Sequence, residues 1–203
     1  MANVRSQQQN TRCEVGQSLV EMVIAVAIIL TGLVGVLSLT VSNLTGATEN
    51  EARIVASNLV REGIEVVRNI RDTNWLKGQV WDAGLKSGTD YTAIAVFNPT
   101  ANTWELNFAP NSIDDPQTQF KKQDDGTYLQ GTESGTPTAY RRLITLDEIC
   151  KDLVNKLETI KSSGEACGMN EEKVGIRVRS EVKWYVSGRT RQMVGEDRIY
   201  NWR

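Results

Sequence analysis

Residues 13–41 read CEVGQSLVEMVIAVAIILTGLVGVLSLTV, and this stretch decides the fold of the N-terminal part of the chain. Residues 22–41 are twenty residues without a charge, and the next charged residue is Glu49. At about 1.5 Å per residue, a helix of this length spans roughly 30 Å, the thickness of the hydrocarbon core of a bilayer. The sequence therefore predicts a helix that crosses a membrane once.

The charges on the N-terminal side of this run predict its orientation. Arg5 and Arg12 outnumber Glu14, so the short N-terminal side is mildly basic. Basic residues favour the cytoplasmic side of a membrane span. We therefore expect the N-terminus inside and the C-terminal part of the chain outside.

Other membrane-targeting segments fit the run less well. A cleavable secretory signal has an apolar core of about 7–15 residues followed by a site of small residues. Here the core is longer, and residues 42–46, SNLTG, are a poor site. A lipoprotein signal is excluded because Cys13 precedes the apolar run. A plain signal anchor remains an alternative.

The order of residues around Gly16 resembles the signal of type IV pilins and pseudopilins. A polar leader ends in Gly16, Gln17-Ser-Leu-Val follows, Glu21 comes next, and the apolar run begins. The resemblance implies that a prepilin peptidase cuts after Gly16 and that the new amino terminus at Gln17 is N-methylated. It also implies that Glu21 pairs with an amino terminus during assembly. The residue after the glycine is most often Phe in the best-known pilins, and Gln17 departs from that pattern. Without the resemblance, Glu21 is a carboxylate that stays wet at headgroup depth.

The resemblance also implies the fold. We expect an α+β, pilin-like chain with a long N-terminal helix packed on an antiparallel sheet. The expected parts are a leader (1–16), a transmembrane and polymerisation helix (17–43), its amphipathic continuation (44–74) and a β-rich head (75–203). Three segments of the head resemble minor pilins more loosely, namely YRRLI at 140–144, SEVKW at 180–184 and YNWR at 200–203.

The function implied is structural: a subunit, expected to be minor, of a type IV pilus or pilus-like fibre. The implied partners are the prepilin peptidase, other pilin subunits, a pilus or secretion assembly platform and membrane lipid. The implied location is the cytoplasmic membrane, with the head outside, and then an extracellular pilus or periplasmic pseudopilus. The alternatives are a pseudopilin of type II secretion and a membrane-anchored extracellular binding module that never polymerises.

Composition gives no sign of catalysis or of a cofactor. The 203 residues include no histidine, so a catalytic triad with an imidazole base is excluded. Gly-x-Gly-x-x-Gly and P-loop motifs are absent. The pairs at 114–115 and 124–125 lack the alternating oxygen ligands of a calcium loop, so we interpret them as turn acids. The net charge of −2 does not favour a nucleic acid partner, although a local basic stripe stays open.

Three cysteines are present, and Cys13 lies in the leader. Cys150 and Cys167 form an even pair in the part expected outside the membrane, so we predict a disulfide between them. Two free thiols are the alternative. A zinc site is not expected, because two cysteines without histidine do not supply four ligands.

The helix is expected to continue beyond the membrane. No proline occurs from 44 to 74, and an apolar stripe follows helical spacing. The stripe, interpreted as core, contains Val55, Leu59, Gly63, Val66, Val67 and Ile70. A charged row on another face is interpreted as solvated and contains Arg61, Glu65, Arg68 and Asp72.

The rest of the chain predicts strands at 91–97, 103–108, 127–129 and 140–146, with the other residues of 109–139 in loops. A helical insert is predicted over 147–164, with Asp147 as its cap and Ile149, Leu153, Leu157 and Ile160 on one face. Alternation over 174–186 predicts a half-buried strand with a bulge near Ser180. A Ser187-Gly188 turn and a return strand from 189 to 194 are expected to follow.

Overall fold

A computed structural model describes residues 14–86, 90–131, 134–162 and 164–202, apart from the side chains of residues 14–18. The helix α1 (Glu14–Leu76) is followed by a β-rich segment. The chain divides into two compact units, one ending at Ala47 and the other beginning at Thr48. The prediction of a helix that continues to about residue 74 is confirmed.

The described part of the first unit is helical, and its apolar side chains are exposed. No residue of its most apolar window is buried, and the helix is long and apolar enough to cross a membrane. Thr31, Thr40 and Thr45 each donate their hydroxyl to the carbonyl oxygen four residues earlier, at 2.8 to 3.0 Å. These bonds satisfy the hydroxyls within the helix, so their donors need no water.

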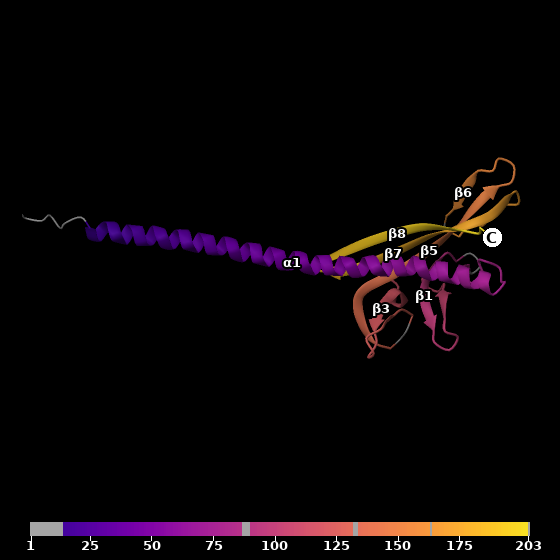
Figure 1. The fold of residues 1–203 in the computed structure, drawn as a ribbon, viewed down its shortest axis with the longest axis horizontal. Helices are drawn as coiled ribbons and strands as arrows, with labels where there is room; N and C mark the ends of the chain where they lie inside the picture. The colour runs from indigo at the N-terminus through magenta and orange to yellow at the C-terminus, as the bar shows by residue number, and fades with distance from the viewer. Residues whose placement is uncertain (1–13, 87–89, 132–133, 163, 203) are drawn as a thin grey trace, which may run out of the picture. The chain divides into compact units, whose positions relative to one another are not determined.

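The second unit packs α1 from Thr48 onward against an antiparallel sheet (Figure 1). Its strands are β1 (Thr92–Asn98), β2 (Thr103–Asn107), β3 (Gln119–Lys122), β4 (Tyr128–Leu129), β5 (Thr136–Asp152), β6 (Glu158–Lys161), β7 (Glu171–Val186) and β8 (Arg189–Tyr200), with a 3-10 turn η1 (Pro116–Thr118). β5 pairs with β7 along one edge, and β7 pairs with β8. Along its other edge β5 pairs in turn with β3, β1 and β6.

Several predicted strands are confirmed, and the hairpin turn is where the sequence placed it. β1 and β2 match the predicted pair, and β7 alternates as expected. Ser187 and Gly188 adopt φ angles of 49° and 77°, which is the left-handed geometry of a two-residue hairpin turn. β3 and the first residues of β5 lie in the segment predicted as loop.

The predicted helix over 147–164 is wrong. β5 continues to Asp152, the chain turns, and β6 runs back from Glu158 to Lys161. Ile149 and Ile160 face each other across this hairpin rather than sharing a helix face. The Asp152 carboxylate accepts the amides of Val154 and Asn155 at 2.7 and 2.8 Å, which fixes a turn instead of a helix. The spacing of the apolar residues from 149 to 160 is compatible with a helix and with a hairpin.

The predicted bulge near Ser180 is also wrong. The β5–β7 register is continuous there and shifts instead between Ile149 and Cys150, where Val174 of β7 has no register partner in β5 and its carbonyl accepts the Asn201 amide at 2.8 Å. Ser180 lies on the same face of β7 as its buried apolar neighbours, and it is buried because it lies under α1. An ideal Cβ on Gly63 would stand 2.4 Å from the Ser180 hydroxyl oxygen. The small residue at 63 therefore lets helix and sheet approach closely.

Two apolar clusters lie on either side of this contact. One surrounds Val67 and Ile144, and the other contains Ala56, Val60 and Trp184. In the second cluster the buried residues of α1 are Ala52, Ala56 and Val60, whereas Val55 is 37% exposed. The predicted stripe was therefore right at Gly63, Val66, Val67 and Ile70, and wrong at Val55.

We predict that Gly63→Ala destabilises the second unit by about 1–3 kcal/mol, the usual range for overpacking. Its Cβ would meet both Ser180 and, at 3.2 Å, Cδ of Arg142. Ser180→Ala should restore part of this loss, because the Ser180 hydroxyl is the nearest atom. That hydroxyl has no hydrogen-bond partner in the described part of the chain.

Denaturant unfolding of the detergent-solubilised full chain, followed by tryptophan fluorescence, measures the change. Gly46→Ala is the control, since no atom lies within 4 Å of an added Cβ there. Equal stability of Gly63→Ala and the unmodified chain would show that the contact is looser than described.

Candidate functional site

The residues predicted to act in processing and assembly lie on α1. Gly16 and Gln17 lie in the helical backbone, and Glu21 is exposed on the helix surface. The side chains around Glu21 are apolar and exposed: Leu19, Val20, Met22, Val23 and Ile24 show 55 to 70% of their surface. A continuous apolar surface of this kind needs lipid or protein to cover it. Glu21 places one carboxylate at the beginning of that surface.

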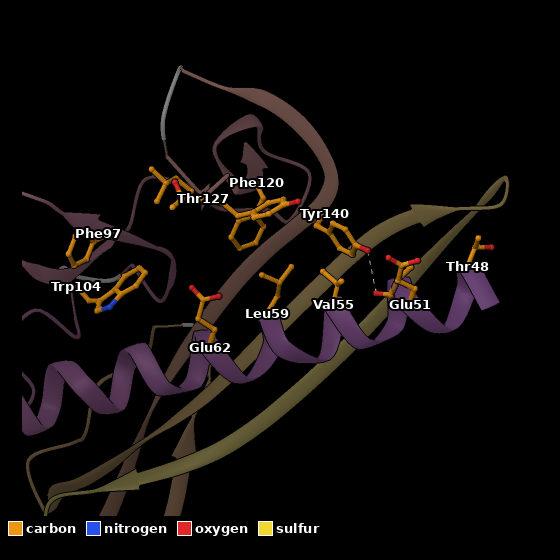
Figure 2. Close-up of a pocket in the computed structure, with 13 residues that line it drawn as sticks. Thr48, Glu51, Val55, Leu59, Glu62, Phe97, Trp104, Phe120, Thr127 and Tyr140 are labelled. Carbon is orange, nitrogen blue, oxygen red and sulfur yellow. Dashed lines mark hydrogen bonds between the residues drawn. The ribbon is translucent and has the colours of Figure 1, made fainter. Parts of the chain in front are cut away.

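A second candidate site is a groove in the second unit, with a volume of about 820 Å³. Figure 2 shows Val55, Leu59 and Glu62 of α1 on one side, with aromatic residues of the strands facing them. We call this the aromatic groove; its lining includes Phe97, Trp104, Phe120, Tyr128 and Tyr140, with Glu51 and Glu62 as acids. The phenolic hydroxyl of Tyr140 donates to the carbonyl of Ala52 at 3.4 Å.

Two aromatic rings of the groove pack against each other, and a buried cation lies against a third. Phe97 and Trp104 meet edge to face, with ring centroids 5.3 Å apart. Arg142 is buried, and its guanidinium lies 4.9 Å from the Phe120 ring centroid. A buried arginine beside a groove needs partners, because an unpaired buried charge is strongly unfavourable.

Those partners come from both sides of the groove. Arg142 Nε donates to Gln130 at 3.1 Å, and Nη1 donates to the Leu59 carbonyl at 3.1 Å. Nη1 also lies 3.5 Å from a Glu62 carboxylate oxygen. Burial lowers the pKa of Arg142, and the charge of Glu62 opposes that shift. Glu62 thus fixes the arginine while its own side chain stays 41% exposed beside the groove.

The predicted disulfide between Cys150 and Cys167 is present, with Cα atoms 5.6 Å apart. It joins the end of β5 to the segment before β7, not a helix. The Cys167 amide donates to Glu148 at 3.1 Å. The sulfur atoms are used in this bond, and the Glu148 oxygens accept from amide and ammonium groups, so this cluster does not offer free metal ligands. Cys13 lies outside the described residues.

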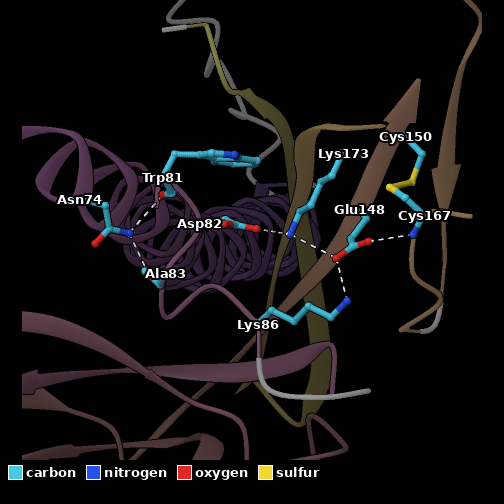
Figure 3. Close-up of polar contacts among 9 residues, drawn as sticks. All are labelled: Asn74, Trp81, Asp82, Ala83, Lys86, Glu148, Cys150, Cys167 and Lys173. Carbon is cyan, nitrogen blue, oxygen red and sulfur yellow. Dashed lines mark hydrogen bonds and ion pairs between the residues drawn. A yellow bond between two sulfur atoms is a disulfide. The ribbon is translucent and has the colours of Figure 1, made fainter. Parts of the chain in front are cut away.

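Glu148 is the centre of a polar cluster (Figure 3). Its carboxylate contacts Lys86 Nζ at 2.8 Å and Lys173 Nζ at 3.1 Å, and Lys173 also pairs with Asp82 at 2.6 Å. Burial opposes ionisation, but the Lys86 hydrogen bond, Lys173 and the Cys167 amide outweigh it and hold the pKa of Glu148 below its usual value. The cluster ties the segment after α1 to β5 and β7.

Basic residues of β7 form local ion pairs. Arg177, Arg179 and Lys183 on β7 form ion pairs with Asp147, Glu181 and Asp114, so this face is charge-balanced and offers little support for a nucleic-acid stripe. Asp147, expected as a helix cap, instead pairs with Arg177 at 2.6 Å.

Of the acids at 114–115 and 124–125, Asp114 pairs with Lys183, and Asp115 and Asp125 have contacts within turns. The Asp115 carboxylate accepts the amides of Asn111 and Ser112, and that of Asp125 accepts the amide and hydroxyl of Thr127. Each carboxylate shapes its own turn.

Sequence reasoning missed the aromatic groove and the burial of Arg142. One signal was present: Tyr140, Arg142, Ile144 and Leu146 share a strand parity, so Arg142 falls at an inward position. The groove itself combines residues from α1 and from five strands, β1 to β5, and no local pattern marks such a combination.

Comparison with known proteins finds no matching family model, no matching curated protein and no matching solved structure. The function is therefore argued from the residues and their arrangement.

We predict that Glu148→Gln destabilises the second unit by about 1–3 kcal/mol at neutral pH, the usual contribution of hydrogen bonds to a charged group. A carboxyl group whose pKa is lowered by folding stabilises the fold above its unfolded pKa and loses this effect as the pH falls through its folded pKa. The difference between the variant and the unmodified chain should therefore shrink below about pH 4.3, the ordinary glutamate value.

Urea unfolding of the full chain in detergent at several pH values measures this difference. Glu165→Gln is the control, because Glu165 is exposed. A difference that stays constant down to pH 3 would mean that Glu148 acts through shape and not through its charge.

Proposed function

We propose that this chain is a structural subunit, of the minor type, of a type IV pilus or pilus-like fibre. The main support is the exposed apolar surface of α1, which begins with the Gly16–Glu21 sequence and has no buried residue in its most apolar window. Lipid covers such a surface while the subunit is in a membrane. Equivalent helices of other copies cover it once the subunit joins a fibre.

Processing prepares the helix for assembly. A prepilin peptidase hydrolyses the peptide bond between Gly16 and Gln17, so the leader keeps the new carboxylate and Gln17 gains a new amino terminus. N-methylation of Gln17 follows in this proposal. Cleavage removes Arg5 and Arg12 together with the leader. These two basic residues hold the N-terminus at the cytoplasmic surface before cleavage.

Glu21 then provides the specific contact. When helices bundle away from water, an unpaired amino terminus and an unpaired carboxylate are each strongly unfavourable. Pairing the Gln17 amino group of one subunit with Glu21 of another removes both penalties. A fibre subunit thus gains from a charge that costs stability in a simple membrane anchor.

We predict that the mature chain begins at Gln17. Intact-mass measurement on protein from its native host checks the expected loss of residues 1–16. Retention of those residues, or a start beyond Val41, would remove the basis of the fibre proposal. The same preparation shows whether the Gln17 amino group carries a methyl group.

We predict that Glu21→Ala sharply lowers incorporation into sheared filaments, at matched membrane levels. Breaking a buried ion pair costs about 3–5 kcal/mol, which exceeds a hundredfold in an equilibrium constant. Cleavage after Gly16 and membrane insertion should stay largely intact. Thr31→Ala is the control, because it removes a hydroxyl that is bonded within its own helix and changes no charge.

The comparison separates the proposal from its alternatives. Equal incorporation of Glu21→Ala and the unmodified chain would show that Glu21 is not an assembly residue. The absence of any filament labelled by antibody would favour a membrane-anchored binding module. Short filaments confined to the periplasm would favour a pseudopilin of type II secretion.

A further inference from the structure

The turn between β5 and β6 carries apolar side chains that the described part of the chain leaves exposed. Val154 is 79% exposed, Leu157 is 67% exposed and Leu153 is 48% exposed. Met169 is fully exposed. It precedes Asn170, whose carbonyl oxygen accepts the Leu153 amide. We call these four residues the β5–β6 tip.

The tip has a fixed shape. The Asp152 carboxylate binds the turn amides, and the Leu153 amide donates to Asn170 at 3.0 Å. The disulfide between Cys150 and Cys167 joins the two segments that carry the tip. An apolar surface held in one conformation loses little conformational entropy when it binds, so the tip is pre-organised for a partner.

The charges beside the tip and the aromatic groove are complementary. Lys156 lies exposed in the turn between Val154 and Leu157. The two neighbouring acids act within the subunit, since Asp152 binds turn amides and Glu158 accepts the Tyr200 hydroxyl at 3.1 Å. The groove carries exposed Glu51 beside its apolar lining, whereas its other acid, Glu62, already pairs with Arg142.

The tip cannot enter the groove of its own subunit. Tyr140, which lines the groove, and Asp152, which begins the turn, lie on the same strand β5, twelve residues apart. At about 3.4 Å per residue, this separates them by roughly 40 Å. Figure 1 shows β6 far along the second unit from the part of α1 that begins at residue 48. Contact between the two surfaces therefore requires two copies.

We propose that the β5–β6 tip of one copy docks in the aromatic groove of the next copy. Val154 and Leu157 enter between α1 and the aromatic wall, and Lys156 faces Glu51. The groove volume, about 820 Å³, lies within the range of about 300–1,000 Å³ that is usual for binding pockets. Because donor and acceptor surfaces differ, each copy can bind one copy before it and one after it, which generates an open row.

This inference rests on the proposed function, because it requires copies of the chain to meet in one membrane or fibre. Its test places a photoreactive phenylalanine analogue at Tyr128, which lines the groove and is 52% exposed. The full chain is made in its native host as a mixture of isotopically heavy and light copies, and illuminated both in membranes and in sheared filaments. Mass spectrometry identifies peptides that join a heavy copy to a light copy.

We expect the probe at Tyr128 to capture the peptide that contains residues 153–157. Val154→Asp should lower this yield at least about tenfold, as expected for an apolar residue at the centre of an interface. Val80→Asp is the matched control, because Val80 is 69% exposed but lies away from the tip in sequence. A probe at Tyr185, exposed on β7, should not capture this peptide.

A charge exchange tests the polar contact. Lys156→Glu should lower the yield, and Glu51→Lys in the copy that supplies the groove should restore it. Unchanged disulfide mobility on non-reducing gels shows that each variant is folded at the tip. Capture of other peptides, or a yield that Val154→Asp leaves unchanged, would overturn the docking.

The outcomes separate docking from fibre assembly. Filaments that form without the tip-to-groove crosslink overturn the docking and leave the fibre proposal standing. A crosslink between copies in membranes, in a host that makes no filaments containing this chain, supports the docking and overturns the fibre proposal. If neither the crosslink nor filaments that contain this chain are found, the docking and the fibre proposal are both overturned.

Discussion

The close contact between α1 and the sheet organises the second unit. Gly63 of the helix lies against Ser180 of β7, and an ideal Cβ on Gly195 of β8 would stand 2.4 Å from Val60 of the helix. Two small residues, one on each partner, let the backbones approach where a larger side chain would separate them. Apolar clusters then form on both sides of the contact.

The same contact fixes the rotation of α1, and the groove follows from that rotation. With Ala52, Ala56, Val60 and Gly63 turned toward the sheet, Val55 and Leu59 face the aromatic residues instead. Arg142 lies between the two environments and needs a partner from the helix, which the Leu59 carbonyl and Glu62 supply. Helix packing, the buried cation and the aromatic groove are therefore parts of one arrangement.

The sequence predicted those features that depend on local patterns. The length of α1, the β1–β2 hairpin, the alternation in β7 and the Ser187-Gly188 turn each reflect a period or a turn chemistry within a few residues. The disulfide was also predictable, because only two cysteines were expected outside the membrane.

The predictions that failed depend on tertiary partners. Apolar residues from Ile149 to Ile160 fit a helix as well as a hairpin, and only pairing with β7 decides between them. The aromatic groove brings together residues from α1 to β5, and its shape depends on the helix rotation that Gly63 permits. Gly16, Gln17 and Glu21 were singled out by a short motif, and their proposed roles depend on other molecules.

The threonine hydroxyls of α1 have a consequence for how neighbouring copies would align in the proposed fibre. Thr31, Thr40 and Thr45 bond to the backbone of their own helix, so they do not direct hydrogen bonds to a neighbour. Dispersion contacts between apolar side chains attract another helix but have little directionality, so the apolar part of this surface contributes little to axial register. In the proposed fibre, the axial spacing then depends on contacts where charge and shape are specific, of which the proposed Glu21 pair is one.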